Sequence, residues 1–139
     1  MTAAGRVLVV GSGTMGRGIA QVVAAAGFDT ALCDVDMAVA ERAIQQIGAA
    51  TQRRVDANKL SAEARAATLA RLTPFSDLKR ASAGIDFVIE AVPENMDLKV
   101  DVLGRVTAAA PDRAIVASNT SSLSITELGQ RLGVGERCI

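Results

Sequence analysis

The sequence predicts an α/β fold in which a mostly parallel sheet is covered by helices on both faces. Short continuous apolar runs alternate with longer segments of helical periodicity, which is the pattern of successive strand–helix–strand units. The chain has 139 residues, half of them apolar, and this is enough for one domain with a sizeable core. Because no repeat or low-complexity linker interrupts the pattern, residues 1–139 are predicted to form a single domain.

The main strands are predicted from four short aliphatic runs, each bounded by turn-forming residues. These runs cover residues 6–10, 29–33, 85–91 and 114–117. A minor strand is expected at 73–75, and residues 137–139 have the composition of the opening of another strand. The continuous apolar character of the main runs indicates strands that are buried on both sides.

Helices are predicted between the strands, where apolar residues recur at helical spacing. Outside the second crossover they cover residues 14–26, 97–110 and 125–132. After the second strand, a long stretch rich in alanine and arginine forms a helical insertion with helices at 38–57 and 61–72. Asn58 is the expected break, and the insertion is either one bent helix or a helical hairpin.

The charge balance excludes several classes of function. With 15 basic and 15 acidic residues, the chain shows no preference for nucleic acid or a membrane surface. Its apolar runs are far shorter than the ~20 residues that a membrane span requires. The first residues lack the basic stretch and apolar core of a secretory signal, so a cytoplasmic protein is expected.

Two cysteines and the absence of histidine limit the chemistry of the chain. Cys33 and Cys138 lie far apart in the sequence, and they are interpreted as reduced thiols rather than a disulfide. Without histidine, the chain lacks the commonest general base and the commonest metal ligand. No metal site is therefore predicted.

A glycine motif of the form G-x-G-x-x-G follows the first strand and opens the first helix. It consists of Gly11, Ser12, Gly13, Thr14, Met15 and Gly16. In this context Gly11 provides the tight turn, Gly13 lets the backbone approach a pyrophosphate, and Gly16 lets helix and strand pack closely. The phosphates then lie at the positive end of the helix dipole. The alternative is a tight strand-to-helix turn that binds no ligand.

Asp34 stands at the end of the second predicted strand, at the distance from the glycines that this motif requires. A carboxylate there accepts hydrogen bonds from the ribose hydroxyls of the adenosine and repels a 2′-phosphate, which favours NAD over NADP. Asp36 competes for the role but lies further past the strand end. A solvated loop acid is the alternative interpretation of Asp34.

Three segments of the sequence resemble the 3-hydroxyacyl-CoA dehydrogenases. They are residues 11–20 (GSGTMGRGIA), 88–99 (VIEAVPENMDLK) and 117–126 (ASNTSSLSIT). Their order and spacing agree with that family over nearly the whole chain, and the bacterial 3-hydroxybutyryl-CoA dehydrogenases are the most similar group. The resemblance implies a Rossmann-type, doubly wound NAD-binding domain. Crystallin-like gulonate dehydrogenases share these segments, so the substrate stays open.

The resemblance also implies roles for single residues. In the family, (S)-3-hydroxyacyl-CoA is oxidised to 3-oxoacyl-CoA while hydride passes to NAD. Glu94 and Lys99 match the pair that contacts the nicotinamide half of NAD, although an exposed ion pair would have the same spacing. Asn119 matches a residue beside the nicotinamide, and Ser121 would hydrogen-bond the 3-oxygen of the substrate. Without the resemblance, residues 119–122 are interpreted as a capping turn.

In the family, the helical segment after the second strand helps to hold coenzyme A. Lys59 in this segment is the expected contact to the phosphates of the coenzyme, and Arg53 and Arg54 compete for that role. A basic, solvated helix face is the alternative interpretation. The acyl-CoA thioester is thus the substrate that the resemblance implies.

The family's general base is a histidine, oriented by a glutamate, and the resemblance places both beyond Ile139 together with a helical dimerisation domain. Residues 1–139 are therefore expected to be the NAD-binding domain of a homodimeric dehydrogenase, able to bind NAD but inactive on their own. A stand-alone NAD-binding regulatory module is the alternative. Glu94, Lys99 and Ser121 favour the enzyme, because a pure NAD binder needs no serine on the substrate side.

Overall fold

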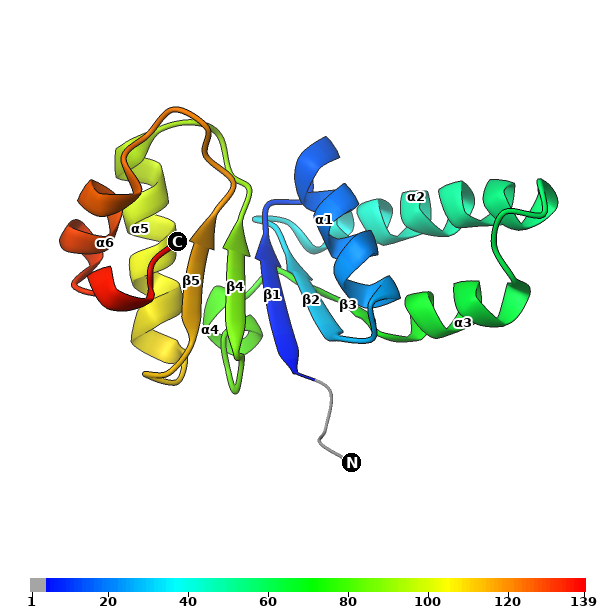
Figure 1. Ribbon diagram of the computed structural model, residues 1–139, viewed down its shortest axis with the longest axis horizontal. Coiled ribbons are helices and arrows are strands. Elements are labelled where there is room, and N and C mark those ends of the chain that lie inside the picture. Colours follow the sequence, from blue (N-terminus) through cyan, green and yellow to red (C-terminus); the bar gives the residue numbers. More distant parts are fainter. Residues whose placement is uncertain (1–4) are drawn as a thin grey trace.

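The computed structural model describes residues 5–139 and has a five-stranded, all-parallel sheet. The order of the strands across the sheet is β3-β2-β1-β4-β5, as Figure 1 shows. The chain thus builds the sheet outward from β1, first to one side and then to the other. The strands are β1 (Arg6–Val10), β2 (Asp29–Cys33), β3 (Leu72–Phe75), β4 (Phe87–Glu90) and β5 (Ile115–Ser118).

Helices cover both faces of the sheet, which confirms the doubly wound fold (Figure 1). Val7 and Val9 of β1 pack against α1 and α2, whereas Leu8 and Val10 face the core that α4 and α5 cover. The third helix packs on α1 and α2, and the last one packs on α5. The helices are α1 (Thr14–Ala25), α2 (Met37–Asp56), α3 (Ala62–Ala70), α4 (Leu78–Ala81), α5 (Met96–Ala109) and α6 (Ile125–Leu132).

The four main strands and the minor one lie where the sequence predicts them, with ends that shift by one or two residues. β3 is the edge strand next to β2 and contains Pro74. An edge position tolerates proline, because an edge strand leaves part of its backbone without a ladder partner. The prediction of a minor strand at 73–75 is therefore confirmed, with Leu72 added.

The helical insertion is a hairpin rather than one bent helix. Asn58 has a φ of 56°, a left-handed conformation that asparagine tolerates better than most residues. This reverses the chain between α2 and α3, which pack against each other and extend to one side of the sheet (Figure 1). The Ser61 hydroxyl accepts a hydrogen bond from the Ala64 N–H at 3.0 Å and so caps α3.

Two parts of the structure differ from the prediction. The short helix α4 was not predicted, because four residues are too few to show helical periodicity; Asp77 caps it. Residues 137–139 were predicted as a strand, but Gly135–Arg137 forms a 3₁₀ turn. Cys138 makes a parallel bridge to Val116 of β5, and Ile139 hydrogen-bonds to β5 through both its N–H and its carbonyl oxygen, so the expected strand pairing begins one residue later than predicted. Within residues 5–139, no helix is both long and apolar enough to cross a bilayer.

Candidate functional site

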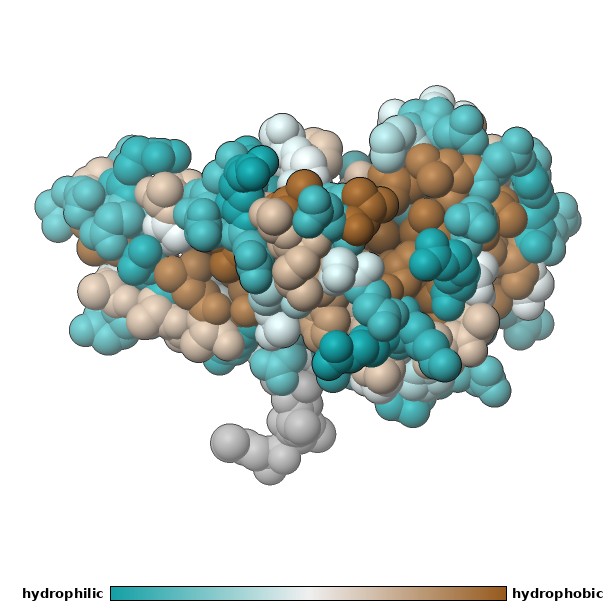
Figure 2. Space-filling model, turned by 180° about the vertical axis from the view of Figure 1, so that it is seen from behind, coloured by the Kyte–Doolittle hydropathy of each residue, from teal (hydrophilic) through white to brown (hydrophobic). Residues whose placement is uncertain are grey.

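A cleft of about 750 Å³ opens at the carboxyl ends of β1, β2 and β4. It lies where the strand order reverses, which is the usual ligand position in open α/β sheets. The glycine motif, the end of β2 and the turn after β4 line it, and Leu98, Val102 and Arg105 of α5 complete one wall. In Figure 2 the half of the molecule that carries α5 and β5 lies on the right, and apolar side chains gather on it. The cleft therefore combines polar backbone with an apolar wall.

The three glycines of the motif meet different surroundings. Gly11 has a φ of 96°, and a Cβ on it would lie 2.7 Å from the Ala91 carbonyl oxygen. A Cβ on Gly16 would lie 1.7 Å from the Gly11 carbonyl oxygen. A Cβ on Gly13, by contrast, would meet no protein atom within 4 Å. The fold itself thus requires Gly11 and Gly16, whereas the space beside Gly13 is open to the cleft.

The N-terminus of α1 lies in this cleft and carries no side-chain cap. Gly13 is its N-cap residue, and no acidic residue stands in its first turn. Side chains cap each of the other α-helices within residues 5–139: Asp36, Ser61, Asp77, Asn95 and Ser124. The free N–H groups of α1 and the positive end of its dipole therefore suit an anionic group, which fits a dinucleotide pyrophosphate.

Asp34 lines the same cleft and is tied to the glycine motif. Its Oδ2 accepts hydrogen bonds from the Ser12 hydroxyl and from the Ser12 N–H at 2.9 Å, and its Oδ1 accepts one from the Val35 N–H at 2.7 Å. Burial by itself raises the pKa of Asp34, but these hydrogen bonds outweigh it and lower the pKa below the ordinary value. Asp36 instead caps α2 through the Ala38 N–H, so only Asp34 of the two competitors faces the cleft.

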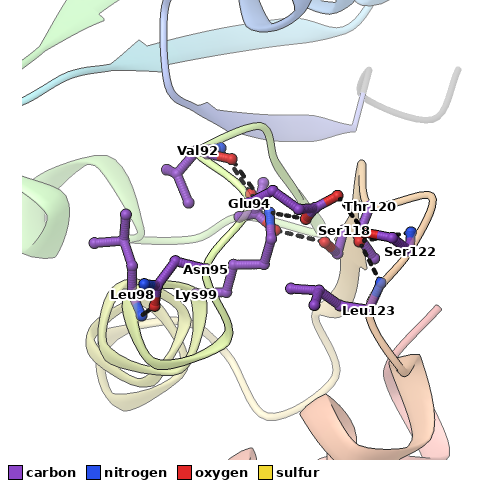
Figure 3. A network of polar contacts seen from close by, with 10 residues as sticks. Val92, Glu94, Asn95, Leu98, Lys99, Ser118, Thr120, Ser122 and Leu123 are labelled. Atoms are coloured by element: carbon purple, nitrogen blue, oxygen red, sulfur yellow. Dashed lines mark hydrogen bonds and ion pairs between the residues drawn. The ribbon is translucent and has the colours of Figure 1, made fainter.

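A second polar group lies beside the cleft, at the ends of β4 and β5 (Figure 3). The Lys99 ammonium is 2.6 Å from Glu90 Oε2 and 3.3 Å from Glu94 Oε1, and it donates to the Val92 carbonyl at 3.2 Å. The side chains of Lys99 and Glu90 are 2% and 0% exposed. The alternative of an exposed ion pair between Glu94 and Lys99 is therefore wrong for the lysine, which is buried against a second acid.

The loop that follows β5 contacts this group through Glu94. The Ser122 hydroxyl donates to Glu94 Oε2 at 3.2 Å, and a hydrogen bond from Thr120 is the main reason why the pKa of Glu94 is below its ordinary value. The Thr120 hydroxyl also accepts from the N–H groups of Ser122 and Leu123. This is the turn expected from the residue types. Ser121 and Asn119 are exposed at its rim.

The predicted site residues thus form two adjacent groups and one distant one. Gly11–Met15 and Asp34 line the cleft, and Gly16 is buried behind it. Glu94 and Lys99 lie next to it, joined through the turn of residues 91–93, and Asn119 and Ser121 are exposed in the loop after β5 that contacts Glu94. Lys59 is exposed in the turn between α2 and α3 and does not line the cleft.

Sequence reasoning missed Glu90 and Ser118, whose hydroxyl donates to Glu90 Oε1. The available signal was Glu90, an acidic residue at the end of an otherwise apolar strand. Nothing nearby in the sequence identifies the groups to which its carboxylate hydrogen-bonds. It also missed Arg105, a cationic side chain on the wall of the cleft. Helical periodicity places Arg105 on α5 without showing which side of the sheet that helix covers.

Cys33 is the thiol nearest to the cofactor cleft. Cys33 is buried at the cleft, and burial raises the pKa of its thiol to about 11, so it is not a ready nucleophile at neutral pH. In the part of the chain that the structure describes, no three His, Cys, Asp or Glu side chains are placed to hold a metal ion.

Known proteins resemble this chain in both sequence and structure. It is 40% identical to the 3-hydroxyadipyl-CoA dehydrogenase of Escherichia coli K12 over 131 residues, which are 94% of this chain and 27% of that protein. It is 34% identical over 133 residues to the 5-formyl-3-hydroxy-2-methylpyridine 4-carboxylate 5-dehydrogenase of Mesorhizobium japonicum, covering 96% of this chain and 42% of that protein.

A crystal structure of 3-hydroxybutyryl-CoA dehydrogenase from Escherichia coli K12 superimposes with a TM-score of 0.91 at 38% identity, over 98% of this chain and 29% of that one. The chain thus spans less than half the length of these relatives. Residues 6–139 match the family described as "3-hydroxyacyl-CoA dehydrogenase, NAD binding domain". The chain therefore belongs to the 3-hydroxyacyl-CoA dehydrogenase family and corresponds to its NAD-binding domain.

Proposed function

We propose that this chain is the NAD-binding domain of an enzyme that oxidises (S)-3-hydroxyacyl-CoA to 3-oxoacyl-CoA. The observation that carries the proposal is the joint placement of the uncapped α1 N-terminus, the open space at Gly13 and the Asp34 carboxylate in one cleft. These three features match the pyrophosphate and the adenosine ribose of one dinucleotide. NAD, when bound, supplies the acceptor for the hydride.

The nicotinamide half is proposed to extend from the glycine motif toward the ends of β4 and β5. Glu94 and Asn119 are exposed there and available to it. The Lys99 ammonium already has three acceptors, on Glu90, Glu94 and Val92. A direct bond from Lys99 to the cofactor therefore requires exchange of its contact with Glu94, whose side chain is 41% exposed and is the most accessible partner.

Ser121 is proposed as the hydrogen-bonding partner of the substrate 3-oxygen. Its hydroxyl is exposed on the loop after β5, beside the proposed nicotinamide position. A hydroxyl there donates to a ketone and accepts from an alcohol, so it serves both directions of the reaction. Lys59 is proposed to contact the phosphates of coenzyme A from the exposed α2–α3 turn, with Arg53 and Arg54 nearby on α2.

Proton removal from the 3-hydroxyl is assigned to a histidine outside these residues, because the 139 residues contain none. The proposed division of the protein is an NAD-binding domain at 1–139, followed by a domain that supplies this base and the dimer interface. The whole protein is proposed to be a cytoplasmic homodimer. Sedimentation of the longer protein as a monomer at micromolar concentration would contradict the dimer.

A dehydrogenase acting on a small hydroxy compound without coenzyme A is the second candidate. The named activity of the Mesorhizobium relative favours it, because that name contains no thioester. A gulonate-type substrate and a stand-alone NAD-binding regulatory module also remain alternatives. Turnover of the longer protein with 3-hydroxybutyryl-CoA and with gulonate distinguishes the enzymes from each other, and a lack of turnover with either favours the regulatory module.

The first test is a fluorescence titration of the chain with NADH and NADPH. The chain has no Trp or Tyr, so the NADH emission is measured against little protein background. NADH is expected to bind more tightly than NADPH, because the Asp34 carboxylate opposes a 2′-phosphate. Equal or tighter binding of NADPH would overturn the role of Asp34, and no binding of either would overturn the proposed function.

A further inference from the structure

A fully buried carboxylate, Glu90, joins three segments of the chain beside the cleft. It ends β4, and its Oε2 accepts from the Lys99 ammonium of α5 at 2.6 Å and from the Val92 N–H at 2.7 Å. Its Oε1 accepts from the hydroxyl of Ser118, the last residue of β5, and its carbonyl oxygen accepts from the Asn119 N–H at 2.8 Å. The ends of β4, β5 and the start of α5 therefore meet on one side chain.

The Lys99 ammonium links buried Glu90 to Glu94, which lies nearer the surface. It is held between buried Glu90 and partly exposed Glu94, and its remaining partner is the Val92 carbonyl. A buried ammonium is tolerated only where an opposite charge and hydrogen bonds compensate its lost hydration. Without the charge on Glu90, burial of the Lys99 ammonium would no longer be compensated, so its side chain would turn toward water. It would then no longer hold Glu94 in place.

Glu94 is the last member of this chain of contacts before the loop. It accepts a hydrogen bond from the Ser122 hydroxyl at 3.2 Å (Figure 3), and the neighbouring Thr120 side chain helps to lower its pKa. Thr120 in turn accepts from the N–H groups of Ser122 and Leu123, at 3.3 Å and 3.0 Å. Ser121 lies between these residues, and within residues 5–139 neither its backbone nor its side chain makes a hydrogen bond of its own. The conformation of its backbone therefore depends on Thr120 and Ser122.

We propose that Glu90 is a positioning residue: through Lys99 and Glu94, it holds the loop of residues 119–123 in one conformation. The proposal rests on the proposed function for the importance of Ser121 in that loop. This role explains why a buried Lys99–Glu90 ion pair stands where two apolar side chains could also fill the space. A buried ion pair contributes little net stability. It does fix the local geometry, because each charged group has only one set of partners.

The test is amide hydrogen exchange of the 139-residue chain and its Glu90→Gln variant. The Ser122 and Leu123 amides are expected to exchange roughly tenfold faster in the variant, relative to any change at core amides of β1, because hydrogen bonds to charged groups hold the loop. Asp97→Asn is the matched control: Asp97 lies on α5 near Lys99, but its side chain is exposed and pairs only with Arg131. It should leave the loop amides unchanged.

A double variant keeps the test valid if Glu90→Gln does not fold. Glu90→Gln with Lys99→Met removes both buried charges together, so it leaves no uncompensated ion and is expected to fold. Its loop amides should also exchange faster, because Glu94 has lost its anchor. Unchanged loop exchange in the folded variants, or an equal acceleration at loop and β1 amides, would overturn the proposal. NADH titration of the unmodified chain tests the proposed function separately.

Discussion

Gly13 and Asp34 are the single residues on which we expect cofactor binding to depend most directly. Neither is needed to fill the core: the space beside Gly13 is open, and the Asp34 side chain is satisfied by Ser12 and Val35 at the surface of the cleft. Substitution of Gly13 should therefore separate binding from stability. Gly11 and Gly16 cannot make that separation, because a side chain on either would collide with backbone.

Gly13→Ala is expected to fold normally and to weaken NADH binding by roughly tenfold or more, because the added methyl occupies the approach path of the pyrophosphate. Gly18→Ala is the control, since a Cβ there also meets no atom within 4 Å but lies further along α1. Fluorescence titration measures both affinities. Equal affinity in the two variants would show that the dinucleotide does not approach Gly13.

Lowering the pH should show how much the ionised Asp34 contributes to the stability of the fold. Its pKa is lower in the folded chain than the value of about 3.9 in an unfolded one. The ionised carboxylate therefore stabilises the fold above that pH, and this contribution is lost as the pH falls through the folded-state pKa. Urea unfolding between pH 6 and pH 3 should show a smaller loss of free energy in Asp34→Asn than in the unmodified chain. Parallel pH curves would contradict this assignment.

At the scale of secondary-structure elements, the two neighbouring acids after β2 have different tasks. Asp34 lines the cleft, whereas the carboxylate of Asp36 accepts the Ala38 N–H at 2.9 Å and caps α2. The cap helps to start a helix of 20 residues that covers one face of the sheet. The two positions should therefore respond to substitution in opposite ways.

Asp36→Ala is expected to lower the free energy of unfolding by about 1 kcal/mol through loss of the helix cap, with unchanged NADH affinity. Asp34→Ala is expected to weaken NADH binding by about 1–3 kcal/mol, as for a lost charged hydrogen-bond partner. Urea denaturation and NADH titration of both variants measure the two quantities. A large loss of affinity in Asp36→Ala would reassign the ribose contact to that residue.

For the molecule as a whole, binding and catalysis are expected to be separable. The cleft for the cofactor lies within the described residues, but the chain contains no histidine and spans less than half of its relatives. A positioned general base contributes roughly 100- to 10,000-fold to such reactions. Among residues 5–139, Glu94 is the acid that contacts the loop after β5, and its lowered pKa makes it a weak base.

The 139-residue chain should therefore bind NADH and yet produce none from NAD and 3-hydroxybutyryl-CoA at a useful rate. The measurement is absorbance at the NADH band, with the longer protein as the positive control. In that longer protein, Ser121→Ala should lower kcat/KM, whereas Ser124→Ala should affect only the cap of α6. Robust turnover by residues 1–139 alone would remove the need for an external base.

Local sequence was enough to predict the strands, the glycine turn and the position of Asp34 at the end of β2, because each depends on residues close together in the chain or on a fixed strand–helix spacing. The Glu90 cluster was not predictable in this way: Ser118 and Lys99 reach Glu90 only because β5 pairs beside β4 and α5 packs behind them. The burial of Lys99 likewise follows from how α5 is placed on the sheet. Whether a charge is exposed or enclosed depends on long-range packing, and that was decided by the tertiary structure alone.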